Sequence, residues 1–186
     1  RPPRSTLSSS SAASVVYKRQ GKVAFPILSE LSSQGCEIDG YWADDACIDE
    51  NGKNLEAKKI TQIKKNCKWQ GLYFGGTAFK KQRVISEDQY VNAAKYASKF
   101  MDVVTTSGVA TGKEAKISKI RLFRSSIGDK PLALASGITV ENAKNYSEVD
   151  CFMVATGINY DDNFYEIDPM KLSKLLNVCR QIGKGE

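Results

Sequence analysis

The sequence of 186 residues contains no histidine. Histidine is the usual general base near neutral pH and the commonest metal ligand, so its absence removes both. The five cysteines are odd in number and include no Cys-x-x-Cys pair. Zinc sites need closely spaced cysteine and histidine pairs, so we expect neither a zinc site nor a disulfide framework. Reduced thiols favour a reducing compartment, and we expect a cytoplasmic protein.

Long apolar runs are also missing: none approaches the roughly 20 residues that a membrane-spanning helix needs. The hydrophobic share of 41% and the charged share of 26% are ordinary for one globular domain with a sizeable core. Acids are absent from residues 1–22, which hold five of the 27 basic residues. The remaining 22 bases face 21 acids, so the domain is nearly neutral and we expect no nucleic-acid partner.

Residues 1–21 are rich in serine and show no apolar period. This composition predicts a disordered tail outside the folded domain, which we place at 22–186. The serine run and the ending VVYKRQ favour a segment derived from a cloning adaptor. The alternative is a transit peptide, because such peptides are rich in arginine and serine and poor in acids. In that case the protein is organellar.

From residue 22 onward, short apolar segments alternate with helical patterns. Strands are predicted to begin near 38, 70, 102, 131 and 150, with helices between them and a last helix after Pro169. The helix at 86–100 opens with a capping-box pattern, Ser86 and Gln89, and the acidic stretch at 159–166 is predicted to be an exposed loop. Successive βα units predict a parallel sheet covered by helices.

Two α/β architectures fit this alternation, a TIM-type (β/α) barrel and an open doubly wound sheet. The doubly wound dinucleotide fold expects G-x-G-x-x-G after its first strand, and the chain has no such string. The barrel instead places functional groups in the loops after its strands, often with a phosphate site after strands seven and eight. We therefore predict the TIM-type barrel.

Two turns, ASGIT at 135–139 and ATGIN at 155–159, place a glycine where an apolar strand ends. Such a glycine lets the backbone approach an anion, and a following helix would direct its N–H groups at it. The alternative is that Gly137 and Gly157 only permit tight turns. Because the two turns follow consecutive strands, we favour phosphate binding, by Ser136, Gly137, Ile138, Thr156 and Gly157.

The run DVVTTSGVATGKEAKISKIRLFR, the run KPLALASGITVENAKNYSEVDCFMVATGIN and the final IDPMKLSKLL resemble the C-terminal half of the BtpA (photosystem I biogenesis) family, which has a ribulose-phosphate-binding-type barrel. The resemblance covers Val23 to Gly183. It implies that the strand at 38–43 is barrel strand four and that the chain is an N-terminally truncated barrel holding about strands four to eight. Such a fragment has open strand edges and an exposed inner face, so we expect self-association.

The departures from the family supply this chain's own candidates. Where bacterial members carry a histidine-rich segment after strand five, this chain reads FGGTAFKKQ, so Lys80 matches a family lysine and both family histidines are lost. Asp44 and Asp45 replace the apolar end of strand four. Adjacent carboxylates there would act as acid-base groups or hold a magnesium ion, and the alternative is a solvated acidic loop.

We therefore predict Asp44, Asp45 and Lys80 as catalytic residues, and we assign no cofactor and no metal ligand. The residues after strand six that would line the same pocket are Ser107, Gly108, Thr111 and Gly112.

The expected function is binding of a phosphorylated sugar or nucleotide-like metabolite at the C-terminal face of the barrel. Two classes stay open: an enzyme acting on that metabolite, and a non-enzymatic binding or assembly factor, as the resemblance to the photosystem family implies. The sequence feature that separates the enzyme from the binding factor is the missing general base. Similarity of fold does not decide which chemistry a protein performs.

Overall fold

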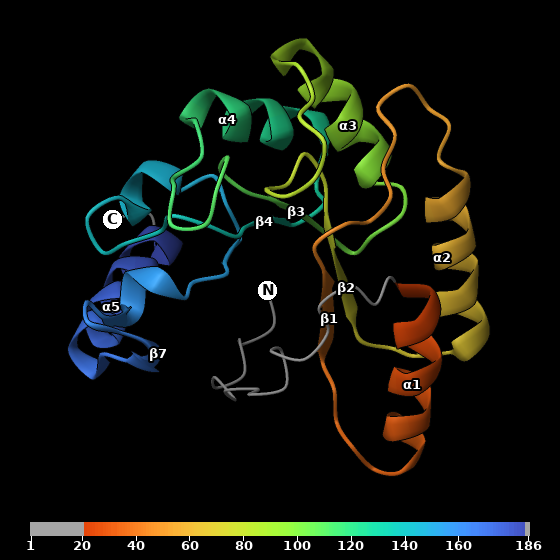
Figure 1. Ribbon diagram of the computed structural model, residues 1–186, viewed down its shortest axis with the longest axis horizontal. Helices are drawn as coiled ribbons and strands as arrows, with labels where there is room; N and C mark the ends of the chain where they lie inside the picture. The colour runs from red at the N-terminus through yellow and green to blue at the C-terminus, as the bar shows by residue number, and fades with distance from the viewer. Residues whose placement is uncertain (1–20, 185–186) are drawn as a thin grey trace.

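A computed structural model describes residues 21–184, and the predicted tail, apart from Gly21, lies outside the described residues. Five strands form one parallel sheet in the order β1-β2-β3-β4-β5. The sheet curls into a half-barrel with helices along its outer side (Figure 1). The strands are β1 (Gly40–Ala43), β2 (Leu72–Gly76), β3 (Val103–Thr106), β4 (Leu132–Leu134) and β5 (Cys151–Phe152). The predicted strand positions and the α/β class are confirmed.

Five helices cover the outer side, and four of them connect or precede strands as the alternation predicted. They are α1 (Gly21–Ser33), α2 (Leu55–Cys67), α3 (Tyr90–Ala97), α4 (Ile117–Ser126) and α5 (Pro169–Lys184). Within the described range 21–184, no helix combines the length and the apolar character needed to cross a membrane. The predicted capping box is wrong: Ser86 Oγ donates to Gln89 Oε1 at 3.1 Å, and η2 (Glu87–Gln89), a short 3₁₀ turn, precedes α3.

The segment after β4 also differs from the prediction. We expected a helix after the ASGIT turn, but the chain forms only η3 (Ala143–Tyr146), a single 3₁₀ turn. The reason is local, because the Asn142 side chain accepts from the amide of Thr139 at 2.9 Å and donates to the carbonyl of Gly137 at 2.7 Å. An asparagine that bonds its own turn in this way competes with helix formation.

The acidic stretch near the C-terminus is a hairpin instead of the predicted loop, although its acids Asp161, Asp162 and Glu166 are exposed as predicted. After η4 (Thr156–Ile158), β6 (Asn159–Tyr160) pairs antiparallel with β7 (Asn163–Ile167). The two aspartates at 161 and 162 form the turn, and the aromatic and β-branched residues on either side suit strands.

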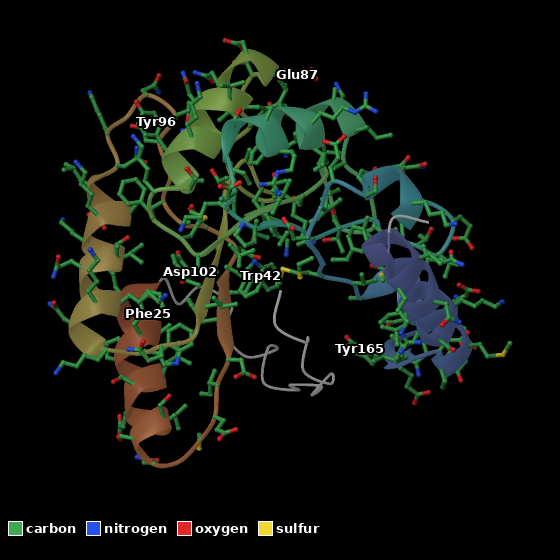
Figure 2. All side chains as sticks on the ribbon, turned by 180° about the vertical axis from the view of Figure 1, so that it is seen from behind. Phe25, Trp42, Glu87, Tyr96, Asp102 and Tyr165 are labelled. Atoms are coloured by element: carbon green, nitrogen blue, oxygen red, sulfur yellow. The ribbon has the colours of Figure 1, made fainter. Side chains whose placement is uncertain are left out.

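The core lies between the sheet and the outer helices. Tyr41 and Tyr73 are neighbours on β1 and β2, and the ring of Phe25 from α1 lies 5.5 Å and 5.2 Å from theirs. Trp69 joins this cluster and is 5% exposed, whereas Trp42 is only half-buried and points to the other side of the sheet (Figure 2). Truncation of a fully buried ring such as Phe25 costs about 3–5 kcal/mol.

The N-terminal edge of the sheet is held by two carboxylates, those of Asp102 and Asp150. Asp102 Oδ2 accepts from the amide of Tyr73 at 2.7 Å, and Asp150 Oδ2 accepts from the amide of Leu132 at 2.9 Å. Asp102 also pairs with Lys64 of α2 (Asp102 is labelled in Figure 2). Both contacts lie at the edge opposite the strand ends where we expect the functional site.

The inner face of the half-barrel is only partly covered by the described residues. Trp42 and Phe74 are neighbours on this face and are half-buried, and Leu72 beside them is 50% exposed. Within residues 21–184, β1 pairs only with β2 and β5 pairs only with β4. The described part of the chain therefore leaves two strand edges unpaired.

Candidate functional site

All the residues predicted from the sequence for the site follow the carboxyl ends of the five strands. In a parallel sheet these ends lie at one edge, so the loops after β1, β2 and β3 and the turns after β4 and β5 share that edge. Asp44 and Asp45 follow β1, and Lys80 lies in the loop after β2. The structure thus places the candidate residues at the same edge of the sheet, where the carboxyl ends of the strands lie.

A cavity of about 630 Å³ lies over the ends of β1 and β2. Asp45 and Asp49 contribute carboxylates to its wall, and Lys81 and Arg83 contribute cations. Of the three predicted catalytic residues, only Asp45 lines this cavity; Asp44 and Lys80 are the chain neighbours of lining residues. The other lining residues are Cys47, Ile48, Asn51 and Gln82.

Gln82 fastens the two loops that form the cavity. Its Nε2 donates to the carbonyl of Asp44 at 2.8 Å and to the carbonyl of Gly76 at 3.1 Å. Asp45 Oδ1 accepts from the amide of Cys47 at 2.8 Å and lies 3.3 Å from the same Gln82 nitrogen. The Asp45 carboxylate is therefore engaged in the structure of its own loop.

Backbone strain is concentrated in these two loops. Cys47, Ala78 and Lys81 have φ of 57°, 46° and 69°, the left-handed region that side chains with a Cβ avoid. Each such residue costs on the order of 1–2 kcal/mol, and strain of this kind gathers at binding and active sites. The loops are thus held in a form that the isolated chain would not adopt.

An ion pair between the buried Glu50 and the exposed Arg83 adjoins the cavity, and Arg83 lines its wall. The Glu50 side chain is 4% exposed, and both of its oxygens accept from the Arg83 guanidinium, one at 2.7 Å. This contact holds the pKa of Glu50 below its usual range. Burial, with Asp45 nearby, raises the pKa of the Cys47 thiol to about 11, so Cys47 stays protonated at neutral pH and is not an activated nucleophile.

The hydroxyls predicted to line the pocket connect neighbouring loops. Ser107 Oγ accepts from the amide of Lys80 at 2.7 Å, and Ser136 Oγ accepts from the amide of Gly108 at 2.8 Å. Ser136 Oγ also donates to the carbonyl of Lys113 at 3.0 Å. Ser107, Gly108 and Ser136 are therefore brought together, whereas residues 111 and 112 (Thr111 and Gly112) lie exposed at the tip of the loop after β3.

The two predicted phosphate-binding turns are in contact. A Cβ added to Gly157 would overlap the carbonyl oxygen of Ile138, and one added to Gly137 would overlap the backbone of Lys113 and Glu114. Gly137 also has φ of +66°. The chain's own backbone thus requires both glycines. Among the described residues, no hydrogen bond engages the amide N–H groups of Gly137 and Ile138.

A second cavity, of about 460 Å³, lies at the opposite edge of the sheet, beside the ends of α1 and α2. None of the residues predicted for the site lines it. Its wall holds Ser29, Ser32, Ser33, Ile38, Cys67, Lys68, Trp69, Gln70 and Gly71.

Sequence reasoning missed Glu50, Gln82, Arg83 and Lys119. The first three lie in charged loops where nothing in the sequence separates an anchoring side chain from a solvated one. Lys119 had a detectable signal, because it lies four residues before Phe123 and so shares the buried face of α4.

Comparisons of the chain with models of known protein families and with curated proteins find no match.

The packing at Gly137 gives a testable expectation. Gly128 has φ of +59° with no atom near its missing Cβ, so Gly128→Ala adds only the left-handed strain, about 1–2 kcal/mol. Gly137→Ala adds the same strain and a clash with the 113–114 backbone, for a further ~1–3 kcal/mol. Urea unfolding of both variants measures the difference. Equal losses of unfolding free energy would show that the loop after β3 does not rest on Gly137.

Proposed function

We propose that this chain is part of a TIM-type barrel of the BtpA kind, and that it binds a phosphorylated sugar or nucleotide-like metabolite at the C-terminal edge of its sheet. The observation that carries the proposal is the turn after β4, where the consecutive amides of Gly137 and Ile138 have no partner among the described residues and Gly137 is left-handed. Consecutive N–H groups around a left-handed residue form a concave anion site.

The neighbouring turn completes this phosphate site. Gly157 packs against the carbonyl of Ile138, so the turn that carries the exposed Thr156 adjoins the turn after β4, and we propose that the Thr156 hydroxyl joins the two amides in binding phosphate. Backbone amides and a threonine hydroxyl donate hydrogen bonds to phosphate oxygens. A phosphate site built from these groups does not need the positive charge of a histidine.

The cavity over β1 and β2 is proposed to take the remainder of the metabolite. Strands β2 and β4 flank β3, and neighbouring strands lie about 4.8 Å apart, so the ends of β2 and β4 are separated by about 10 Å. That span suits a sugar phosphate. The cavity volume of about 630 Å³ is within the range of metabolite sites, and its wall offers charges of both signs.

The geometry of the site supports ligand binding more directly than it supports catalysis. Asp45 is engaged by the Cys47 amide and Gln82, and the Cys47 thiol stays protonated. These observations favour the second candidate, a non-enzymatic binding or assembly factor that recognises the metabolite. The five cysteines are free, which fits the reducing cytoplasm proposed as its location.

Thermal unfolding in a phosphate series, against chloride at matched ionic strength, tests the phosphate site. A ligand at ten times its Kd adds about 1.4 kcal/mol to the free energy of unfolding. Thr156→Val removes one hydroxyl donor, and a tenfold weaker Kd would leave about 0.4 kcal/mol at the same concentration. Thr111→Val, at an exposed threonine on the tip of the loop after β3, should behave like the unmodified protein. Equal phosphate protection in all three proteins, or none in any, would reject the site.

We also propose that the open edges and the inner face drive self-association. Sedimentation velocity should show a coefficient that increases with protein concentration, because unpaired parallel strands and exposed apolar side chains favour pairing between copies. Leu72→Lys, on the inner face, should suppress the increase. Leu55→Lys is the control, since Leu55 is 66% exposed on α2. A single monomeric species at every concentration would contradict the proposal.

A further inference from the structure

Lys119 of α4 is a buried lysine without a carboxylate partner among the described ion pairs. The residue is 7% exposed, and its Nζ donates to the carbonyl of Ala78 at 2.6 Å and to the carbonyl of Ser107 at 2.8 Å. The rings of Tyr90 and Phe123 lie 5.1 Å and 5.8 Å from the same nitrogen. Two carbonyl dipoles and two ring faces therefore surround this ammonium group.

The two carbonyls belong to different loops of the C-terminal edge. Ala78 lies in the loop after β2 and has left-handed φ, and its carbonyl also accepts from Thr106 Oγ1 at 3.4 Å. Ser107 begins the loop after β3, and its hydroxyl accepts from the amide of Lys80. Lys119 thus joins the two loops at the start of the strained stretch that leads to Lys81 and the cavity.

The same contacts continue to the proposed phosphate turn. Gly108 follows Ser107 and donates through its amide to Ser136, whose hydroxyl donates to Lys113. The backbone of 113–114 lies against Gly137. A displacement of Ser107 would therefore reach both the loop after β2 and the turn after β4.

Fold stability alone does not account for a lysine at this position. Removing an ammonium group from water is costly, and an apolar side chain of similar length would fill the space between Tyr90 and Phe123 without that cost. What only the lysine supplies is a pair of charge-assisted hydrogen bonds to two loops.

We propose that Lys119 is a positioning residue of the C-terminal edge, whose ammonium group holds the loops after β2 and β3 in one fixed arrangement. Its effect on ligand affinity rests on the function proposed above, whereas the positioning of the loops does not.

Amide hydrogen exchange tests the positioning directly. Lys119→Met should speed exchange at the amides of Lys80 and Gly108 by about tenfold or more, because Ser107 and the loops that it joins lose their anchor. Exchange at Val104, whose amide bonds to the carbonyl of Pro131 inside the sheet, should not change, and the melting temperature should stay equal or rise. Lys119→Gln keeps an N–H donor without the charge and should increase exchange at the same amides by less than Lys119→Met does. It replaces Lys119→Met in this experiment if the Met variant does not fold.

Lys116→Met is the matched control, since Lys116 directly precedes α4 and makes an exposed ion pair with Glu87. Its exchange pattern should match that of the unmodified protein. Unchanged exchange at Lys80 and Gly108 in the Lys119 variants would overturn the proposal. A uniform loss of protection across the sheet would also overturn it, because that is the result of an ordinary core residue.

The pH profile gives a readout that a purely apolar core role would not produce. Burial lowers the pKa of Lys119 to about 8, against an ordinary value of 10.5. Between these values the unfolded chain binds more protons, so the lysine's contribution to stability should increase from pH 8 to 10.5 in the unmodified protein and not in Lys119→Met. The described groups that face the amine are Tyr90 from α3 and the two loop carbonyls, with the Glu87–Lys116 pair near the start of α4.

Phosphate melts of the Lys119 variants separate the two proposals. If phosphate protects the unmodified protein, the protection should be smaller in Lys119→Met. If phosphate protects none of the proteins, the phosphate site fails, and the exchange data alone decide whether Lys119 positions the loops.

Discussion

A continuous series of side-chain hydrogen bonds to backbone groups joins the loops at the C-terminal edge, and the arrangement of the candidate site depends on it. Gln82 ties the loop after β2 to the end of β1, Lys119 ties it to the loop after β3, and Ser136 ties that loop to the turn after β4. Each bond satisfies a backbone group in a loop that follows a strand. The strained residues Ala78 and Lys81 lie within this series.

The two edges of the sheet are built differently. At the N-terminal edge, Asp102 and Asp150 accept from strand amides and pair with Lys64 and Arg124, which fixes the strands with charge. At the C-terminal edge, amides, hydroxyls and the Lys119 ammonium group bond to backbone groups of the loops, and the amides of Gly137 and Ile138 are left unengaged by the described residues. In TIM-type barrels, the class that we propose for this chain, the N-terminal edge serves stability and the C-terminal edge carries function.

The sequence predicted the strands well because each is a short apolar run bounded by Gly, Pro or Asp. The prediction from the sequence failed after β4, where the Asn142 side chain bonds to its own turn and a helix does not form. It also failed at residues 161 and 162, where two aspartates form a hairpin turn that we predicted as a loop. The glycine pattern located two turns at strand ends, but the sequence did not show why glycine is needed there, which is that the backbone of neighbouring loops fills the space at Gly137 and Gly157. Lys119 escaped prediction because lysine is usually exposed. Its spacing from Phe123 could have indicated burial, but its contact with two distant carbonyls is visible only in the structure.

The central claim is that the C-terminal edge, through the turns after β4 and β5, receives a phosphate group. A ¹H–¹⁵N NMR titration of the uniformly labelled protein with inorganic phosphate tests it most directly, because each backbone amide reports separately. The account predicts saturable shifts that are largest at Gly137, Ile138 and Thr156. Shifts confined to the cavity at the opposite edge, around Ser32 and Gly71, or no saturable shift at all, would contradict it.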